Sequence, residues 1–207
     1  MFLIERKWGY SKVPFSLKNT MTKFTRKGLH IAELRTIDKK IAKEGLGIIH
    51  DAMDKYNVFF WLSEGTALGY VRDNDIISYD DDVDMGIFIE DKSVLIDKVI
   101  PELKKHGFKV MFSISNFICL TYKNIDYDID ITGKGKLCVA SFLPCDDVLP
   151  YLQEFNTVSI NNKEYNIPTI DYIRHLYGDT WHIPIKRDKP GVTNRWPMIY
   201  KLITTNE

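Results

Sequence analysis

The chain has 207 residues and a mass of 24.1 kDa, the size of one domain that can bury its own hydrophobic core. Hydrophobic residues make up 44% of it, charged residues 27% and aromatic residues 13%, which argues against collagen-like, disordered and membrane-spanning chains. No stretch approaches ~18 consecutive apolar residues, and Glu5 interrupts the apolar start too early for a secretory signal. We therefore expect a soluble, cytoplasmic protein without a transmembrane segment.

The net charge of zero conceals an uneven distribution of charge along the chain. Residues 1–30 contain seven Lys and Arg against one acidic residue, a charge of +6. Residues 45–100 contain four Lys and Arg against twelve acidic residues, a charge of −8, and five of these acids lie between Asp75 and Asp84. Carboxylates packed so closely repel one another, so this distribution indicates a bound cation.

The cysteine and histidine patterns argue against other kinds of site. Three cysteines without a C-x-x-C pair disfavour a disulfide framework and a zinc ribbon, so we expect plain, reduced cysteines. Five histidines without H-E-x-x-H spacing disfavour zinc catalysis.

Apolar residues at spacings of three and four predict a first helix from Ile31 to Asn57. The apolar run Val58–Leu62 predicts a strand, which a turn and a short helix to Val71 follow. An Asp-rich loop then leads into a predicted buried strand at Val83–Ile89. The next helix is predicted over residues 92–106, with Pro101 as a potential break.

The second half of the chain reads as short strands that form a meander, followed by small helices. The predicted strands are Lys109–Ser115, Phe117–Lys123, Tyr127–Thr132 and Leu137–Leu143, with a short helix at Val148–Phe155, a hairpin at Thr157–Tyr165 and a helix at Ile170–Tyr177 capped by Thr169. Without internal repeats or linkers, this order predicts one α+β domain over residues 31–207. The basic residues 1–30 are expected to form an arm packed on it; a polyanion-binding patch is the alternative.

Two acidic segments carry the chemistry that we expect. Side chains at positions i and i+2 of a strand share one face, so Asp82 and Asp84 project together while Val83 points into the core. Such a pair of carboxylates suits Mg²⁺ or Mn²⁺, which would also bind substrate phosphates. The strand with Asp126, Asp128 and Asp130 repeats the same spacing, and it completes the site if it lies beside the first. The alternative for Asp80–Asp84 is a solvated acidic loop.

The turn before the acidic loop supplies candidate phosphate-binding groups. Gly65 and Thr66 follow a strand and open a helix, where unpaired N–H groups attract an anion, although an ordinary tight turn is the alternative. Arg72 can bind a phosphate, or it can form a salt bridge with Asp82 or Asp84. We place Glu64 and Asp80 with these substrate-binding residues.

These residues together resemble the LicD/fukutin family of the nucleotidyltransferase-fold superfamily. The family motif W-x-x-x-G-[ST]-x-L-G-x-x-R, followed by W-D-x-D-[IV]-D, is matched by Trp61, Gly65, Thr66, Leu68, Gly69, Arg72, Asp80, Asp82, Val83 and Asp84. Tyr79 replaces the family's usual Trp. Leu176-Tyr-Gly-Asp-Thr-Trp181 resembles a C-terminal L-Y-G-x-x-W element, so the resemblance covers about residues 45–185.

The resemblance implies a nucleotidyltransferase (polymerase beta-like) fold, with a mixed central sheet flanked by helices. It also implies transfer of phosphocholine, ribitol phosphate or glycerol phosphate from a CDP-linked donor to a glycan or polysaccharide hydroxyl, with CMP as product. Asp82 and Asp84 would bind Mg²⁺, and either Asp128 or Asp130 would be the third carboxylate. The chain departs from the family at that strand because no Pro follows these acids.

Two other functions remain open on the same residues. A nucleotidyltransferase would move NMP from an NTP to a small molecule, protein or nucleic acid, and would release pyrophosphate instead of CMP. An inactive nucleotide- or glycan-binding module would release neither. No stable nucleic-acid partner is expected.

Overall fold

The computed structural model describes residues 37–138 and 143–184. The predicted basic arm and residues 185–207 lie outside these ranges. The helices are α3 Lys39–Lys55, α4 Glu64–Asp73, α5 Lys92–Val94, α6 Ile100–Lys105, α7 Cys145–Val148 and α8 Ile170–Tyr177, with single turns at Ile89–Asp91, Leu95–Val99 and Leu149–Tyr151. The strands are β1 Phe60–Leu62, β2 Asp82–Phe88, β3 Lys109–Ile114, β4 Phe117–Tyr122, β5 Ile125–Thr132, β6 Leu137–Cys138, β7 Leu143–Pro144, β8 Phe155–Ile160 and β9 Lys163–Pro168.

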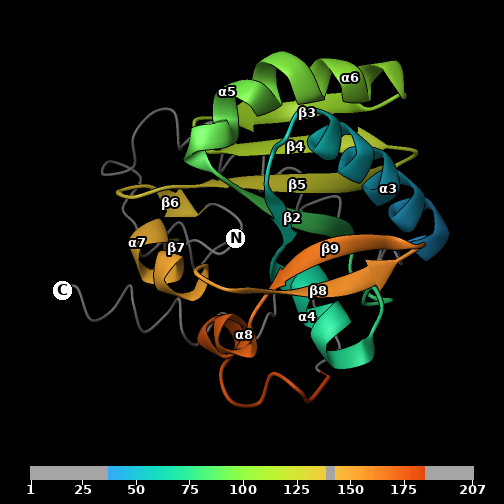
Figure 1. Cartoon of the computed structure of the whole chain (residues 1–207). Helices are drawn as coiled ribbons and strands as arrows, with labels where there is room; N and C mark the ends of the chain where they lie inside the picture. Colours follow the sequence, from blue (N-terminus) through green and yellow to red (C-terminus); the bar gives the residue numbers. More distant parts are fainter. Residues whose placement is uncertain (1–36, 139–142, 185–207) are drawn as a thin grey trace, which may run out of the picture.

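A seven-stranded mixed sheet with the order β3-β4-β5-β2-β1-β9-β8 organises the domain (Figure 1). The strands β3, β4 and β5 form the predicted antiparallel meander. The pairs β2–β5 and β1–β9 are parallel, and the other neighbours are antiparallel. The prediction of an α+β domain with a mixed central sheet flanked by helices is confirmed.

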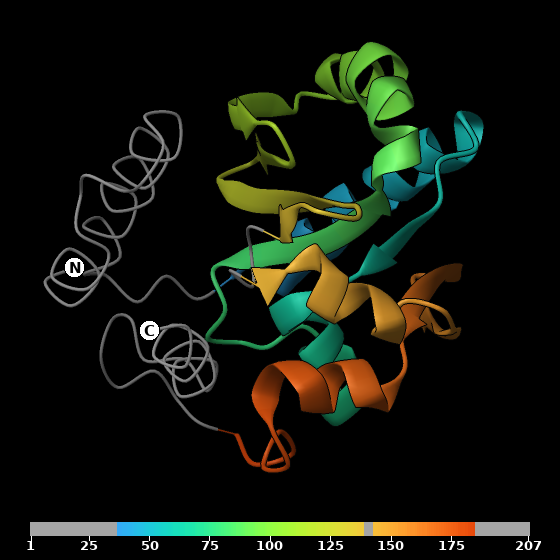
Figure 2. The same cartoon turned by 90° about the vertical axis from the view of Figure 1, so that its left-hand side faces the viewer.

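The two faces of the sheet carry different side chains because strand residues alternate. On β2, Val83, Met85 and Ile87 are buried in the main apolar core. Their layer packs on α3, since the hydroxyl of Tyr127 on β5 donates to the carbonyls of Ile41 and Ala42 at 3.1 and 3.2 Å. The other face of β2 carries Asp82, Asp84, Gly86 and Phe88. The helices α4 and α8 lie side by side (Figures 1 and 2).

Most local predictions hold, and the exceptions have physical reasons. Asn161 and Asn162 adopt positive φ values of 50° and 64° at the predicted hairpin between β8 and β9, as a two-residue turn requires. Pro101 does not break the helical stretch, because a π turn over Leu95–Val99 precedes it and places Pro101 in the first turn of α6. There its missing N–H is tolerated.

Two predicted elements are wrong in detail. Instead of one strand over Leu137–Leu143, β6 and β7 form a two-stranded antiparallel pair. Instead of a helix over Val148–Phe155, α7 and a single turn end at Tyr151, and Phe155 opens β8. The three cysteines are buried free thiols, as expected. Within the described residues, no helix has both the length and the apolar character needed to cross a membrane.

Candidate active site

The acidic strands β2 and β5 are direct neighbours in the sheet. The spacing of the acidic residues could not by itself predict that the two strands pair. They pair in parallel with Asp82 opposite Asp126, Asp84 opposite Asp128 and Gly86 opposite Asp130. Opposed residues share a face of the sheet, so both sets of carboxylates lie on the face away from α3. Val83, between the acids of β2, is fully buried, as predicted.

Three carboxylates converge where the acidic loop enters β2. Oxygen atoms of Asp80, Asp82 and Asp84 all lie within 4.8 Å of one another. Asp80 and Asp84 are only 8% and 7% exposed. Burial, followed by the charges of Asp84, Asp80 and Asp128, raises the pKa of Asp82 well above its usual value. Hard oxygen ligands at this spacing suit Mg²⁺ or Mn²⁺, so the residues present fit such an ion.

The turn before α4 holds Asp84 in place. The backbone N–H of Ser63 donates to the Asp84 carbonyl at 3.1 Å, and the N–H of Gly65 donates to Asp84 Oδ2 at 3.0 Å. In return, the N–H of Asp84 donates to Thr66 Oγ1 at 2.8 Å. The N-terminus of α4 therefore stabilises a carboxylate of the protein itself. In this structure the N–H of Gly65 and Thr66 Oγ1, predicted for phosphate, bind Asp84.

Position 65 requires glycine because the carboxylates come so close to its backbone. A Cβ atom there would lie 2.4 Å from Asp80 Oδ2 and 3.3 Å from Asp84 Oδ2. The same contact shows that Asp80 belongs with the carboxylate cluster, whereas the sequence analysis placed it with the substrate-binding residues. The spacing of Asp80, Asp82 and Asp84 at every second residue was the signal that could have identified it.

Asp128 and Asp130 have different surroundings, although both are buried and lie on the same strand. Asp128 is opposite Asp84 and is one of the charges that raise the pKa of Asp82. Asp130 is opposite Gly86, over which the Trp61 indole packs, and it lines a small cavity with Glu64. Only Asp128 therefore adjoins the cluster directly.

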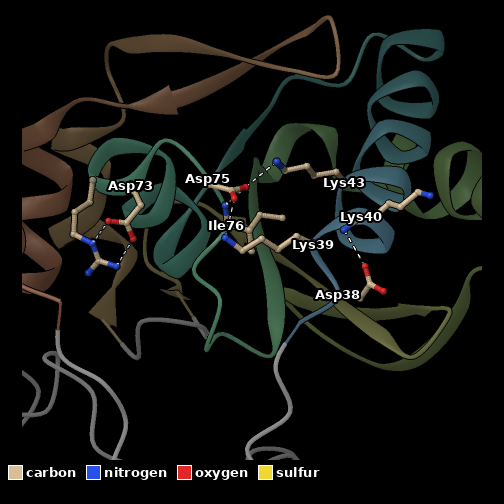
Figure 3. A network of polar contacts seen from close by, with 8 residues as sticks. Asp38, Lys39, Lys40, Lys43, Asp73, Asp75 and Ile76 are labelled. Atoms are coloured by element: carbon tan, nitrogen blue, oxygen red, sulfur yellow. Dashed lines mark hydrogen bonds and ion pairs between the residues drawn. The ribbon is translucent and has the colours of Figure 1, made fainter.

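Arg72 forms an ion pair with its neighbour Asp73. Its Nε donates to Asp73 Oδ1 at 2.9 Å, and its Nη2 donates to Asp73 Oδ2 at 2.6 Å and to the Tyr79 hydroxyl at 3.3 Å. These hydrogen bonds, with that to Asp73 the largest cause, raise the pKa of Arg72. Figure 3 shows Asp73 in this network. The salt bridge of Arg72 in this structure is thus with Asp73.

A second ion-pair group fixes the loop that leads to the cluster. Lys39 Nζ and Lys43 Nζ on α3 contact the two oxygens of Asp75 at 2.7 and 2.8 Å (Figure 3). Partial burial alone would raise the pKa of Asp75, but the hydrogen bonds from the two lysines lower it to about 2. The sequence analysis missed this contact because it joins residues more than 30 positions apart.

A mixed sheet with two acidic strands side by side, preceded by a strand–Gly-Thr–helix turn, defines a nucleotidyltransferase-type domain. The sequence model described as "LicD/FKTN/FKRP, nucleotidyltransferase domain" matches residues 57–127, which include the turn, the cluster on β2 and the start of β5. The predicted resemblance is thereby confirmed: the chain belongs to the LicD/fukutin family.

Individual proteins are also similar to this chain in sequence. The human protein named ribitol-5-phosphate transferase FKTN is 32% identical over 179 residues, which cover 77% of this chain and 39% of the human protein. An uncharacterized protein of Rickettsia prowazekii (strain Madrid E) is 36% identical over 87 residues, covering 42% of this chain and 31% of its own. The chain thus matches well under half the length of these relatives.

Among solved structures, the antibiotic-resistance factor ANT(2'')-Ia is similar with a TM-score of 0.49 and 15% identity. The alignment covers 81% of this chain and 85% of the other.

Proposed function

We propose that this chain is a Mg²⁺-dependent phosphotransferase that moves a phospho-alcohol from a CDP-linked donor to a glycan hydroxyl and releases CMP. The observation that carries the proposal is the convergence of Asp80, Asp82 and Asp84, with Asp128 on the neighbouring strand. Ribitol phosphate is the favoured group, because the name of the human relative specifies a ribitol-5-phosphate transferase.

The cluster would hold Mg²⁺ through Asp80, Asp82 and Asp84, and Asp128 on the neighbouring strand would serve as the general base. A bound ion would offset charge on the donor diphosphate as the reaction proceeds. The turn at residues 63–66 holds Asp84 through two backbone N–H groups and the Thr66 hydroxyl, so Asp84 would be a fixed ligand for such an ion. The ion pair between Arg72 and Asp73 lies at the end of α4 and would help to hold the loop that leads to the cluster.

In the proposed reaction the acceptor hydroxyl oxygen attacks the phosphorus that bears the alcohol. The bond between that phosphorus and the oxygen bridging to CMP breaks, and CMP leaves with the bond electrons. Asp128 is the carboxylate that accepts the proton of the attacking hydroxyl. The bond that forms joins the glycan oxygen to the transferred phosphorus.

A product screen tests this function. The full chain is incubated with Mg²⁺ and a panel of CDP-alcohols and NTPs, and CMP and pyrophosphate are separated and quantified. The proposal expects CMP from CDP-ribitol or a related donor. Pyrophosphate from an NTP would instead indicate a nucleotidyltransferase proper, and neither product would favour a binding module.

The choice of Asp128 as third carboxylate has its own test. Asp128→Asn should lower turnover by about 10²–10⁴-fold, the usual contribution of a general base. Asp130→Asn, on the same strand and equally buried, should leave turnover much closer to that of the unmodified chain. A larger loss in Asp130→Asn than in Asp128→Asn would reverse the assignment.

A further inference from the structure

Glu64 differs from its neighbours in the turn before α4. Its side chain is only 2% exposed, and its φ of 47° lies in the left-handed region that non-glycine residues seldom occupy. Glu64 lines a small cavity that Trp61 and Asp130 also line. A conformation of this kind persists only where the surroundings hold it.

The backbone of Glu64 lies between the groups that hold Asp84. Ser63 donates to the Asp84 carbonyl on one side of it, and Gly65 donates to the Asp84 carboxylate on the other. A change in the backbone at position 64 would therefore turn the Gly65 N–H away from Asp84 Oδ2. The backbone at position 64 therefore bears on the hydrogen bond that orients one carboxylate of the cluster.

The contact that accompanies this conformation comes from α8, more than 100 positions further along the chain. The hydroxyl of Tyr172, a residue only 2% exposed, donates to Glu64 Oε1 at 3.4 Å. Because α4 and α8 also pack on each other, the pair joins α8 to the turn that holds Asp84.

We propose that Glu64 is a positioning residue, and that its contact with Tyr172 sets the geometry of the turn that orients Asp84 and hence the affinity of the cluster for a divalent cation. The sequence analysis placed Glu64 with the substrate-binding residues; here it acts through Asp84 instead. The inference rests on the proposed function only in that the cluster binds a divalent cation.

The first test compares two Tyr→Phe variants by calorimetric titration of the full chain with Mn²⁺. Tyr172→Phe removes the hydroxyl that contacts Glu64. Loss of a group that hydrogen-bonds a metal ligand commonly weakens metal binding by about 10–100-fold, and because Tyr172 acts one contact further away we expect a loss at the lower end of this range. Tyr70→Phe is the matched control, since Tyr70 is buried on α4 and its hydroxyl has no hydrogen-bond partner among the described residues. Its Mn²⁺ affinity should be unchanged.

Two substitutions of Glu64 separate positioning from other roles. Glu64→Gln keeps an oxygen that accepts from Tyr172, so it should retain most of the Mn²⁺ affinity. Glu64→Gly permits the positive φ but removes the contact, so it should bind Mn²⁺ more weakly without a lower melting temperature.

Two results would overturn the inference while leaving the proposed function standing: full Mn²⁺ affinity in Tyr172→Phe, or Glu64→Gln as weak as Glu64→Gly. An unmodified chain that binds no Mn²⁺ would contradict the proposed function and the inference together. The titration of the unmodified chain therefore distinguishes the two failures.

Discussion

At position 65 a single methyl group would collide with the carboxylates of the site. The N–H of Gly65 reaches Asp84 because the residue has no side chain, and the space that a Cβ atom would need is occupied by Asp80 Oδ2. The site is therefore built by close packing of backbone against charge, with the N-terminus of α4 offsetting part of that charge.

Gly65→Ala should consequently lose metal affinity by about tenfold or more and stability by about 1–3 kcal/mol, through displacement of the carboxylates. Gly47→Ala on α3 is the matched control, since its Cβ would meet nothing closer than Lys163 Cε at 3.9 Å. There alanine should raise helix stability by about 0.5–1 kcal/mol. Calorimetric Mn²⁺ titration and urea unfolding of both variants measure these effects, and equal behaviour would contradict the close-packing explanation.

The residues of this site were largely predictable, but some of their roles were not. The period-two spacing identified Asp82 and Asp84, because strand geometry puts them on one face. It left the third carboxylate open between Asp128 and Asp130, since only the pairing of β2 with β5 places Asp128 opposite Asp84. The function of Gly65 could not be derived in the same way. Its donated hydrogen bond goes to a residue 19 positions later, and nothing in the sequence of a Gly-Thr turn specifies whether its N–H groups face a ligand or the protein.

At the scale of elements, the loop between α4 and β2 is anchored to α3 by charge. Asp75 forms ion pairs with Lys39 and Lys43, which lie on successive turns of α3. Asp80 of the cluster follows five residues later in the chain. These ion pairs thus hold the loop that enters β2 against α3, which packs on the face of the sheet opposite the carboxylates.

Asp75→Asn tests this anchor through its dependence on pH. The pKa of Asp75 is lowered to about 2, so its contribution is present above its ordinary value of 3.8 and is lost as the pH falls through about 2. At pH 7 the variant should be less stable by about 1 kcal/mol, a value discounted for partial exposure, and the difference should vanish near pH 2. Urea unfolding at several pH values measures it. An equal difference at pH 7 and pH 2 would exclude the ion pairs as its cause.

Element prediction succeeded where hydrophobic periodicity was strong and failed where short segments depend on tertiary contacts. The helix α3, β2 and the meander follow from apolar spacing. The helix α3 begins only at Lys39, after its cap Asp38, and residues 31–36 of the predicted helix lie outside the described ranges. The pair β6–β7 is only two residues a side, and the N–H of Cys145 beside it donates to the Lys136 carbonyl, a contact that no local pattern encodes. The helical stretch continues past Pro101 because a π turn over Leu95–Val99 accommodates the N–H group that proline lacks. Helix propensities alone do not predict such a turn.

On the scale of the whole molecule, the charge of −8 over residues 45–100 has a structural explanation. Part of it is neutralised within the fold by lysines outside this range, such as Lys39 and Lys43, which form ion pairs with Asp75. The carboxylates of Asp80, Asp82 and Asp84 instead face one another. Their mutual repulsion opposes folding, and a bound cation of the kind proposed would turn the same arrangement into a source of stability.

Thermal unfolding with and without Mg²⁺ should show this reversal. Because the pKa of Asp82 is raised, its contribution to stability is present at pH values below 3.8 and is lost as the pH rises through the raised value. Mg²⁺ at 100 times its Kd should add about 2.7 kcal/mol at pH 7.5. The gain should be smaller at pH 5, where protons compete for the same carboxylates.

Asp82→Asn provides the control for that measurement. Without Mg²⁺ it should be at least as stable as the unmodified chain at pH 7.5, since one repelling charge is gone. An identical Mg²⁺ gain at both pH values, or an undiminished gain in Asp82→Asn, would show that the ion acts elsewhere.

The most direct test of the proposed activity is CMP release from CDP-ribitol in saturating Mg²⁺ by the unmodified chain and by Asp84→Asn. Asparagine preserves the size of the side chain and an oxygen that can accept from Gly65, so the melting temperature should be retained. Turnover should fall by about 10³-fold or more, because the loss of the charge weakens both metal binding and its electrostatic effect on the donor. Turnover in Asp84→Asn close to that of the unmodified chain would contradict the assignment of the acidic cluster as the catalytic centre.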